Sequence, residues 1–247
     1  MSGSNGTART ERINGIEMYC ELQGEGKPLL LLHGFTGSGA DWGLVFPGPP
    51  EGYRLVIPDL RGHGRSTNPS AEFTFRHSAL DVLALLDRLD IDRCLAIGLS
   101  AGAKTLLHMA TRQAGRIDRM VLVSAAPYFP ERARLIMRQL TVESRTEAEW
   151  QLMRQQHPRG DEQIRALWKQ AHAFKDSYED LSFTPPLLAT ITARTLIVHG
   201  DRDPFYPLDL ALQMHAAIPR AVLTTVRRWA RPGQAFSRAA RPACRRA

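Results

Sequence analysis

Short, continuous runs of apolar residues recur along the chain, separated by polar turns and by longer periodic stretches. Such runs are typical of strands that are buried on both faces of a parallel sheet. In the first half of the chain they occupy residues 28–32, 53–57, 94–97 and 120–124. The pattern returns at residues 195–200 and 221–226, so we expect these six segments to form the body of one sheet.

Helical periodicity fills the intervals between these runs. Leu and Val recur at helical spacing over residues 75–89, and residues 104–111 and 208–218 are also predicted to be helical. Near the start of the chain, Asn14-Gly15 between short apolar stretches is a type I′ turn signal and predicts a hairpin. Because strands alternate with helices, the predicted fold class is α/β, with a mostly parallel central sheet, flanking helices and right-handed crossovers.

Residues 128–190 depart from this alternation, because they are amphipathic, rich in Arg, Glu and Gln, and predicted to be helical, with interruptions at Pro158-Arg159-Gly160 and Pro185-Pro186. A segment of this length is too long for a loop, so we expect a helical lid inserted between two sheet strands. The predicted organisation is a core of residues 11–127 and 191–226, a lid of residues 128–190, and an Arg/Ala/Pro-rich tail of residues 227–247. Large apolar side chains of the lid form either a pocket wall or the lid's own core. They are Trp150, Met153, Trp168 and Phe174.

The net charge of +7 belongs to the tail, which holds seven arginines and no acidic residue. Without the tail, 25 basic residues stand against 25 acidic ones. A neutral body gives no reason to expect a nucleic-acid or membrane partner, although an arginine-rich arm that binds phosphate is a rival interpretation of the tail. Three cysteines make no disulfide framework, and neither an apolar leader nor a run of membrane-spanning length is present, so a cytoplasmic location is expected.

The candidate chemistry centres on Gly98-Leu99-Ser100-Ala101-Gly102, between a predicted strand and a predicted helix. Gly-x-Ser-x-Gly at such a junction is the pattern of a nucleophile elbow, in which a strained turn presents the serine hydroxyl above the sheet. Glycines on either side let the backbone pass close to its neighbours. The N-terminus of the following helix favours a developing negative charge.

A serine nucleophile needs a base, an acid that orients the base, and donors for the oxyanion. Asp203 follows a buried strand and is the preferred acid, with Asp201 as its rival. The expected oxyanion donors are the backbone N–H groups of Phe35 and Ala101. His33 is expected to brace its loop rather than to act as the base.

These segments together resemble the α/β-hydrolase family, from about residue 13 to residue 226. The resemblance rests on His33-Gly34-Phe35, on the stretch Asp-Leu-Arg-Gly-His-Gly-Arg-Ser at residues 59–66, on the serine motif, and on the acid loop that begins at Gly200. It implies Ser100 as nucleophile, Asp203 as triad acid, a largely architectural role for residues 59–66, and no cofactor or metal. A serine nucleophile points to a small, apolar ester, thioester or lactone substrate.

The family places its catalytic histidine after the strand that follows the acid, here residues 221–226. The last histidine of this chain is His215, which precedes that strand, so no triad His is found. The tail also lacks the apolar periodicity of the final helix that the resemblance implies. Permitted codons for residues 228–233, read one base out of frame, give Gly-Gly-His-Gly-Pro-Val, which is similar to the family's histidine loop. We therefore expect a frameshift near Arg227 that removes the base and the last helix and impairs activity. The alternative is a non-catalytic protein that binds a small ligand on the same fold.

Overall fold

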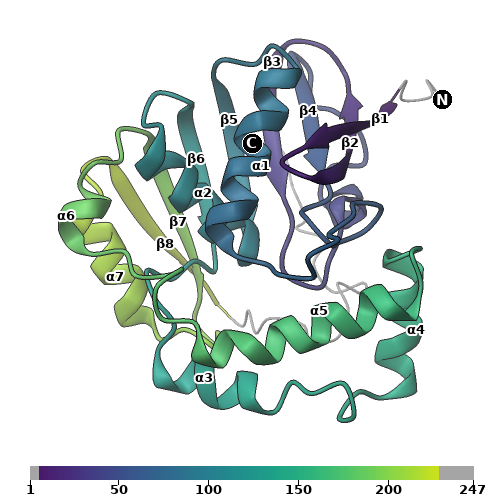
Figure 1. Ribbon diagram of the computed structural model, residues 1–247. Helices are drawn as coiled ribbons and strands as arrows, with labels where there is room; N and C mark the ends of the chain where they lie inside the picture. Colours follow the sequence, from purple (N-terminus) through teal and green to yellow (C-terminus); the bar gives the residue numbers. More distant parts are fainter. Residues whose placement is uncertain (1–5, 228–247) are drawn as a thin grey trace.

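The computed structural model describes residues 6–227, which form an eight-stranded sheet with helices packed against it (Figure 1). The spatial order of the strands is β1-β2-β4-β3-β5-β6-β7-β8. Strands β1 and β2 pair in antiparallel fashion and β2 is antiparallel to β4, whereas all other neighbours are parallel. The strands are β1 (Thr7–Ile13), β2 (Ile16–Gln23), β3 (Lys27–Leu32), β4 (Tyr53–Pro58), β5 (Cys94–Leu99), β6 (Ile117–Val123), β7 (Arg194–Gly200) and β8 (Ala221–Val226). The predicted fold class is confirmed.

The N-terminal hairpin forms at the predicted turn, because Asn14 and Gly15 both adopt positive φ angles of 47° and 79°. Its first strand starts earlier than the predicted core boundary at residue 11. Thr7 already pairs with Leu22 in the antiparallel ladder. Ladder hydrogen bonds use only backbone groups, so a polar edge strand forms without the apolar pattern on which that boundary was based.

One face of the sheet carries the main hydrophobic core, which includes residues of α1 (Phe75–Arg88), α2 (Ala101–Arg112) and α7 (Leu208–Ala217). On the opposite face the 3-10 helix η1 (Gly39–Leu44) places Trp42 against residues of β3 and β4. Alternate residues of the central strands on that second face, including Leu95, Ile97 and Val121, are only half-buried. The two faces are therefore covered unequally within residues 6–227.

The chain between β6 and β7 is helical, as predicted, and forms α3 (Glu131–Arg138), α4 (Glu147–Gln156), α5 (Asp161–Ala173), η2 (Phe174–Asp176) and α6 (Pro185–Leu188). In Figure 1, α3, α4 and α5 lie below the sheet, across the end of α1. We call residues 131–188 the inserted helices. Met153, Trp168 and neighbours form a small apolar cluster of their own, while Phe174 belongs to the main core. The sequence predicts that the tail lacks a final helix. Residues 228–247 of that tail lie outside the described part.

Candidate active site

Ser100 occupies the turn between the end of β5 and the start of α2. Its φ of 52° and ψ of −102° depart from both strand and helix and are strained for a residue with a side chain. The flanking glycines are required by close backbone approach. A Cβ added to Gly98 would lie 2.6 Å from the backbone nitrogen of Ala103, and one added to Gly102 would lie 2.2 Å from the carbonyl oxygen of Leu32.

Backbone hydrogen bonds hold this turn against the neighbouring strands. The N–H of Ser100 donates to the carbonyl oxygen of Val123 over 2.8 Å, and the N–H of Gly102 donates to that of His33 over 3.0 Å. Ser100 is 8% exposed. The serine is thus held in a rigid frame near the carboxyl ends of β3, β5 and β6, where open α/β sheets bind ligands.

The loop after β3 runs beside the serine turn. A Cβ on Gly34 would lie 3.7 Å from the side chain of Leu99, the residue before Ser100. Within residues 6–227, the backbone N–H groups of Phe35 and Ala101 take part in none of the loop or cap hydrogen bonds. An oxyanion hole requires two backbone N–H groups that are not already paired within the loop.

His33 braces this loop, as predicted. One ring nitrogen, Nδ1, lies 2.8 Å from the carbonyl oxygen of Gly34, and the other, Nε2, accepts a hydrogen bond from the N–H of Leu60 over 3.0 Å. With both nitrogens engaged, the imidazole joins the ends of β3 and β4.

The loop at residues 59–66 is held by hydrogen bonds to its own first residue. The carboxylate of Asp59 accepts from the N–H groups of Gly39 (2.7 Å) and Arg65 (2.8 Å). The hydroxyl of Ser66 donates to the Asp59 carbonyl oxygen over 2.7 Å. Arg61 forms a buried, bidentate pair with Asp81 at 2.7 and 3.0 Å. Through these contacts the loop at residues 59–66 supports the structure around it.

Asp203 is buried after β7, whereas Asp201 is exposed. The Oδ1 of Asp203 accepts from the N–H groups of Phe205 (2.9 Å) and Tyr206 (3.1 Å), and its Oδ2 accepts from the hydroxyl of Ser124. These donors hold the Asp203 carboxylate in one orientation. The geometry favours Asp203 over its rival as an oriented acid.

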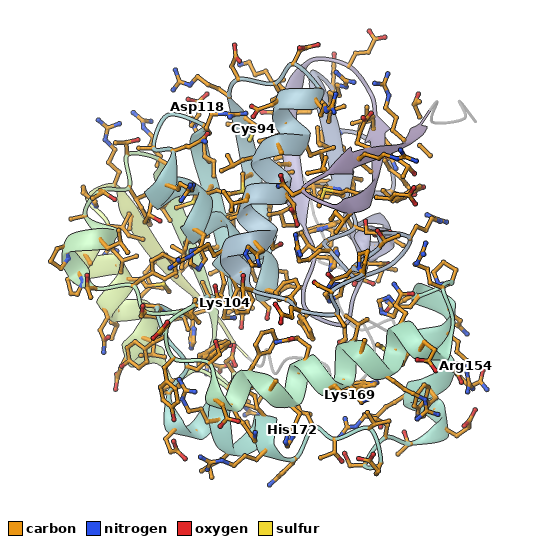
Figure 2. The ribbon with its side chains drawn as sticks, in the orientation of Figure 1. Cys94, Lys104, Asp118, Arg154, Lys169 and His172 are labelled. Atoms are coloured by element: carbon orange, nitrogen blue, oxygen red, sulfur yellow. The ribbon has the colours of Figure 1, made fainter. Side chains whose placement is uncertain are left out.

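Ser124 and Lys104 belong to this region although the sequence pattern did not single them out. Ser124 follows β6 with a φ of 54°, and its position at a strand's carboxyl end was the available signal. Lys104 is buried one helical turn after Ser100, near the lower end of the helices in Figure 2. Its Nζ lies 3.4 Å from the Ser100 carbonyl oxygen and 4.6 Å from the Tyr206 ring centroid, with the rings of Phe75 and Phe129 at 5.7 Å.

The chain has eight histidines, of which His33 is described above. His77 and His215 are exposed, and His108 contacts the backbone of Asp180 at 2.7 Å. His63 and His157 are buried beside the loops after β3 and β4, and burial lowers the pKa of both. Within residues 6–227, no hydrogen bond joins Ser100 to a histidine.

A large opening near these loops is not at Ser100. A cleft of about 890 Å³ opens between the hairpin turn, the loop at residues 61–73 and α5, and Ser100 does not line it. Residues 6–227 contain no group of three His, Cys, Asp or Glu side chains placed to hold a metal ion. Among the helices described, none has the length and apolar character needed to cross a bilayer.

The amino-acid sequence is similar to those of known proteins. Residues 27–147 match the family model described as the alpha/beta hydrolase fold. The chain is 34% identical over 115 residues to a soluble epoxide hydrolase of Corynebacterium sp., a match that covers 47% of this chain and 40% of the relative. It is 28% identical over 237 residues to the 2-hydroxymuconate semialdehyde hydrolase of Pseudomonas sp., covering 85% of this chain and 82% of the relative. The matched part spans less than half the length of the first curated relatives.

Solved structures share the fold. An enol-lactonase from Burkholderia xenovorans superposes with a TM-score of 0.73 at 21% identity, covering 88% of this chain and 91% of the other. A meta-cleavage product hydrolase from Pseudomonas fluorescens superposes with a TM-score of 0.71 at 22% identity, covering 90% of each chain. The family model covers β3 to β6 and the serine turn, so the chain is a member of the α/β-hydrolase family.

Proposed function

We propose that this chain is built as a serine hydrolase of carboxylic esters, thioesters or lactones, with Ser100 as the nucleophile. The observation that carries the proposal is the backbone of Ser100, which has a positive φ between two glycines that admit no side chain. A strained serine at a strand–helix junction is the backbone form of a nucleophile elbow. Solved structures with this fold include an enol-lactonase and an N-acyl homoserine lactone degrading enzyme, which supports the ester and lactone class.

In the proposed reaction, the Ser100 hydroxyl oxygen attacks the substrate carbonyl carbon while a base takes its proton. The carbonyl π electrons move onto oxygen, and the N–H groups of Phe35 and Ala101 donate to that oxyanion. Removing one such donor typically costs about 3 kcal/mol of barrier. Collapse of the intermediate expels the alcohol, thiol or ring oxygen, and water then hydrolyses the acyl-serine.

Asp203 has the role of orienting the base, but the sequence has no histidine after residue 215. We therefore propose that turnover by this chain is impaired, and that a frameshift near Arg227 replaced the histidine loop. Loss of one triad member leaves only the catalysis that the oxyanion hole and substrate binding supply. The second candidate, a binding protein for a small ligand, is favoured by the same missing base.

We further propose that the inserted helices act as a lid over the carboxyl edge of the sheet. The small apolar cluster around Met153 and Trp168 supports this placement, because Phe35 of the loop after β3 packs against it. The proposed substrate is a small, apolar, ester-like molecule, with no cofactor, metal, nucleic acid or membrane involved, and the proposed location is the cytoplasm.

The test compares this chain, its Ser100→Ala variant, and a version with the Gly-Gly-His reading frame restored on a panel of p-nitrophenyl esters and lactones. We expect weak turnover by the parent, little change in Ser100→Ala, and a gain of at least 100-fold in the restored chain that Ser100→Ala abolishes. Ligand-induced thermal stabilisation without turnover in any version would favour the binding protein. An active restored chain that is insensitive to Ser100→Ala would refute the assignment of the nucleophile.

A further inference from the structure

His157 is buried at the carboxyl end of α4, where the inserted helices meet the sheet domain. It is 1% exposed and caps the helix. Its two ring nitrogens reach loops that lie 121 and 93 residues away in the sequence. A buried histidine with long-range partners on both nitrogens is a specific contact between the two parts of the chain.

The partners define the proton positions on the ring. Nε2 lies 3.0 Å from the carbonyl oxygen of Thr36, which can only accept, so Nε2 carries the proton. Nδ1 accepts from the N–H of Gly64 over 2.9 Å, so it carries none. Burial lowers the pKa of His157 to about 4, which keeps this neutral form at physiological pH.

Two glutamines of the inserted helices support the same junction. The amide nitrogen of Gln163, on α5, donates to the carbonyl oxygens of Gly62 and Gly64, both over 2.9 Å. The amide nitrogen of Gln156 donates to the carboxylate of Asp41 over 2.7 Å. Together these contacts bind the inserted helices to the loops after β3 and β4.

The contact at Thr36 bears directly on the candidate oxyanion donor. Thr36 has a φ of 65°, which is unfavourable for a β-branched residue and persists only where its surroundings hold it. Its hydroxyl donates to the carbonyl oxygen of Phe35 over 2.6 Å, while its own carbonyl oxygen takes the hydrogen bond from His157. Fixing the peptide after Thr36 therefore restrains the backbone of Phe35.

From this geometry we infer that His157 is a positioning residue that holds the Phe35–Thr36 turn in place, so that docking of the inserted helices and formation of the oxyanion hole are one event. The inference rests on the proposed function for its catalytic meaning. The hydrogen bonds at Thr36 and Gly64 carry its structural part. His157 itself does not touch the reacting atoms.

The test uses three variants of the full chain. His157→Leu removes both hydrogen bonds, whereas His157→Gln keeps an acceptor and a donor on one side chain. Gln151→Leu is the matched control, because Gln151 lies on the same helix and, within the described part, its side chain bonds only to the exposed Glu147. Amide hydrogen exchange over residues 33–41 is measured for each. The labelling rate of Ser100 by a fluorophosphonate is measured for the same substitutions in the chain with the restored Gly-Gly-His frame, because the proposed function leaves the parent without its base.

We expect His157→Leu to speed exchange at residues 33–41 and 62–66 by at least tenfold while α2 stays protected. Labelling of Ser100 should slow by a similar factor, and His157→Gln should restore most of both. Unchanged exchange in His157→Leu, or an equal rise in Gln151→Leu, would overturn the inference. If exchange responds as expected but the chain with the restored Gly-Gly-His frame is never labelled, the positioning of the loop stands and the proposed function fails.

Discussion

The carbonyl oxygen of His33 accepts a hydrogen bond from the backbone N–H of Gly102 over 3.0 Å. This contact joins the end of β3 to the first turn of α2, and it brings the loop of Phe35 beside Ser100. The approach is possible because residue 102 has no side chain, since an added Cβ would fall 2.2 Å from the Leu32 carbonyl oxygen. The close contact between β3 and α2 therefore depends on the absence of a Cβ at residue 102.

Gly102→Ala should consequently destabilise the fold. Accommodating the methyl requires β3 and α2 to separate, and such overpacking costs about 1–3 kcal/mol. Urea unfolding followed by circular dichroism measures the change. The control is Gly115→Ala, because a Cβ at Gly115 meets nothing within 4 Å. Equal stability losses in the two variants would contradict the steric argument.

Removing the hydroxyl that serves Asp203 should also be costly. Ser124→Ala leaves the Oδ2 of a buried carboxylate without that donor, and a hydrogen bond to a charged group contributes about 1.5–3 kcal/mol. Stability to urea at pH 7 reports the loss. Ser70→Ala, at an exposed loop position, should change it by less than about 0.5 kcal/mol. A Ser124→Ala variant as stable as the parent would show that Asp203 does not depend on this donor.

For the buried Arg61–Asp81 pair, removing one partner should cost more stability than replacing both. Asp81→Ala leaves a buried guanidinium uncompensated, and breaking such a pair costs about 3–5 kcal/mol. Replacing both partners by apolar residues, as Arg61→Met with Asp81→Leu, should recover most of that loss. The exposed pair of Arg138 and Glu131 is the control, and Glu131→Ala should cost less than about 1 kcal/mol. Chemical denaturation of the parent and these three variants checks the order.

Stability should fall as the solution is acidified from pH 6.5 to about pH 4, in part through His157. Burial lowers the pKa of His157 from an ordinary value of 6.5 to about 4. The charge effect of His33 adds to the shift, whereas the hydrogen bond at Thr36 and the charge of Asp59 oppose it. Between these values the unfolded chain binds a proton that the folded chain does not, so stability rises with pH in this window. The contribution is at most about 3 kcal/mol.

The measurement is urea unfolding of the parent and of His157→Gln at several pH values. The variant should show a shallower pH dependence between pH 4 and 6.5, because glutamine does not titrate. The burial of His63 shifts its pKa in the same direction, so part of the slope should remain. Identical slopes in parent and variant would exclude His157 as a contributor.

Local patterns in the sequence predicted much of this molecule. The Asn14-Gly15 turn, the helix that begins at Phe75 and the strand Ala221–Val226 form where expected, because each is encoded by propensity and periodicity over a few neighbouring residues. The serine motif also predicted its own backbone conformation, since only glycine fits at the two flanking positions. Bracing by His33 followed from its place at a strand end.

Contacts between distant segments could not be predicted in this way. The order of the strands brings Ser124 to Asp203, and nothing in the residues around Ser124 identifies its partner. Docking of α4 against two loops turns His157, otherwise an ordinary helix-end residue, into a bridge between Thr36 and Gly64. Local preference thus accounts for most elements and for the serine turn, and the lack of a histidine after residue 215 is visible in the chain itself. Which side chains meet follows from the folded arrangement, because long-range pairing depends on packing of the whole chain and not on local preference.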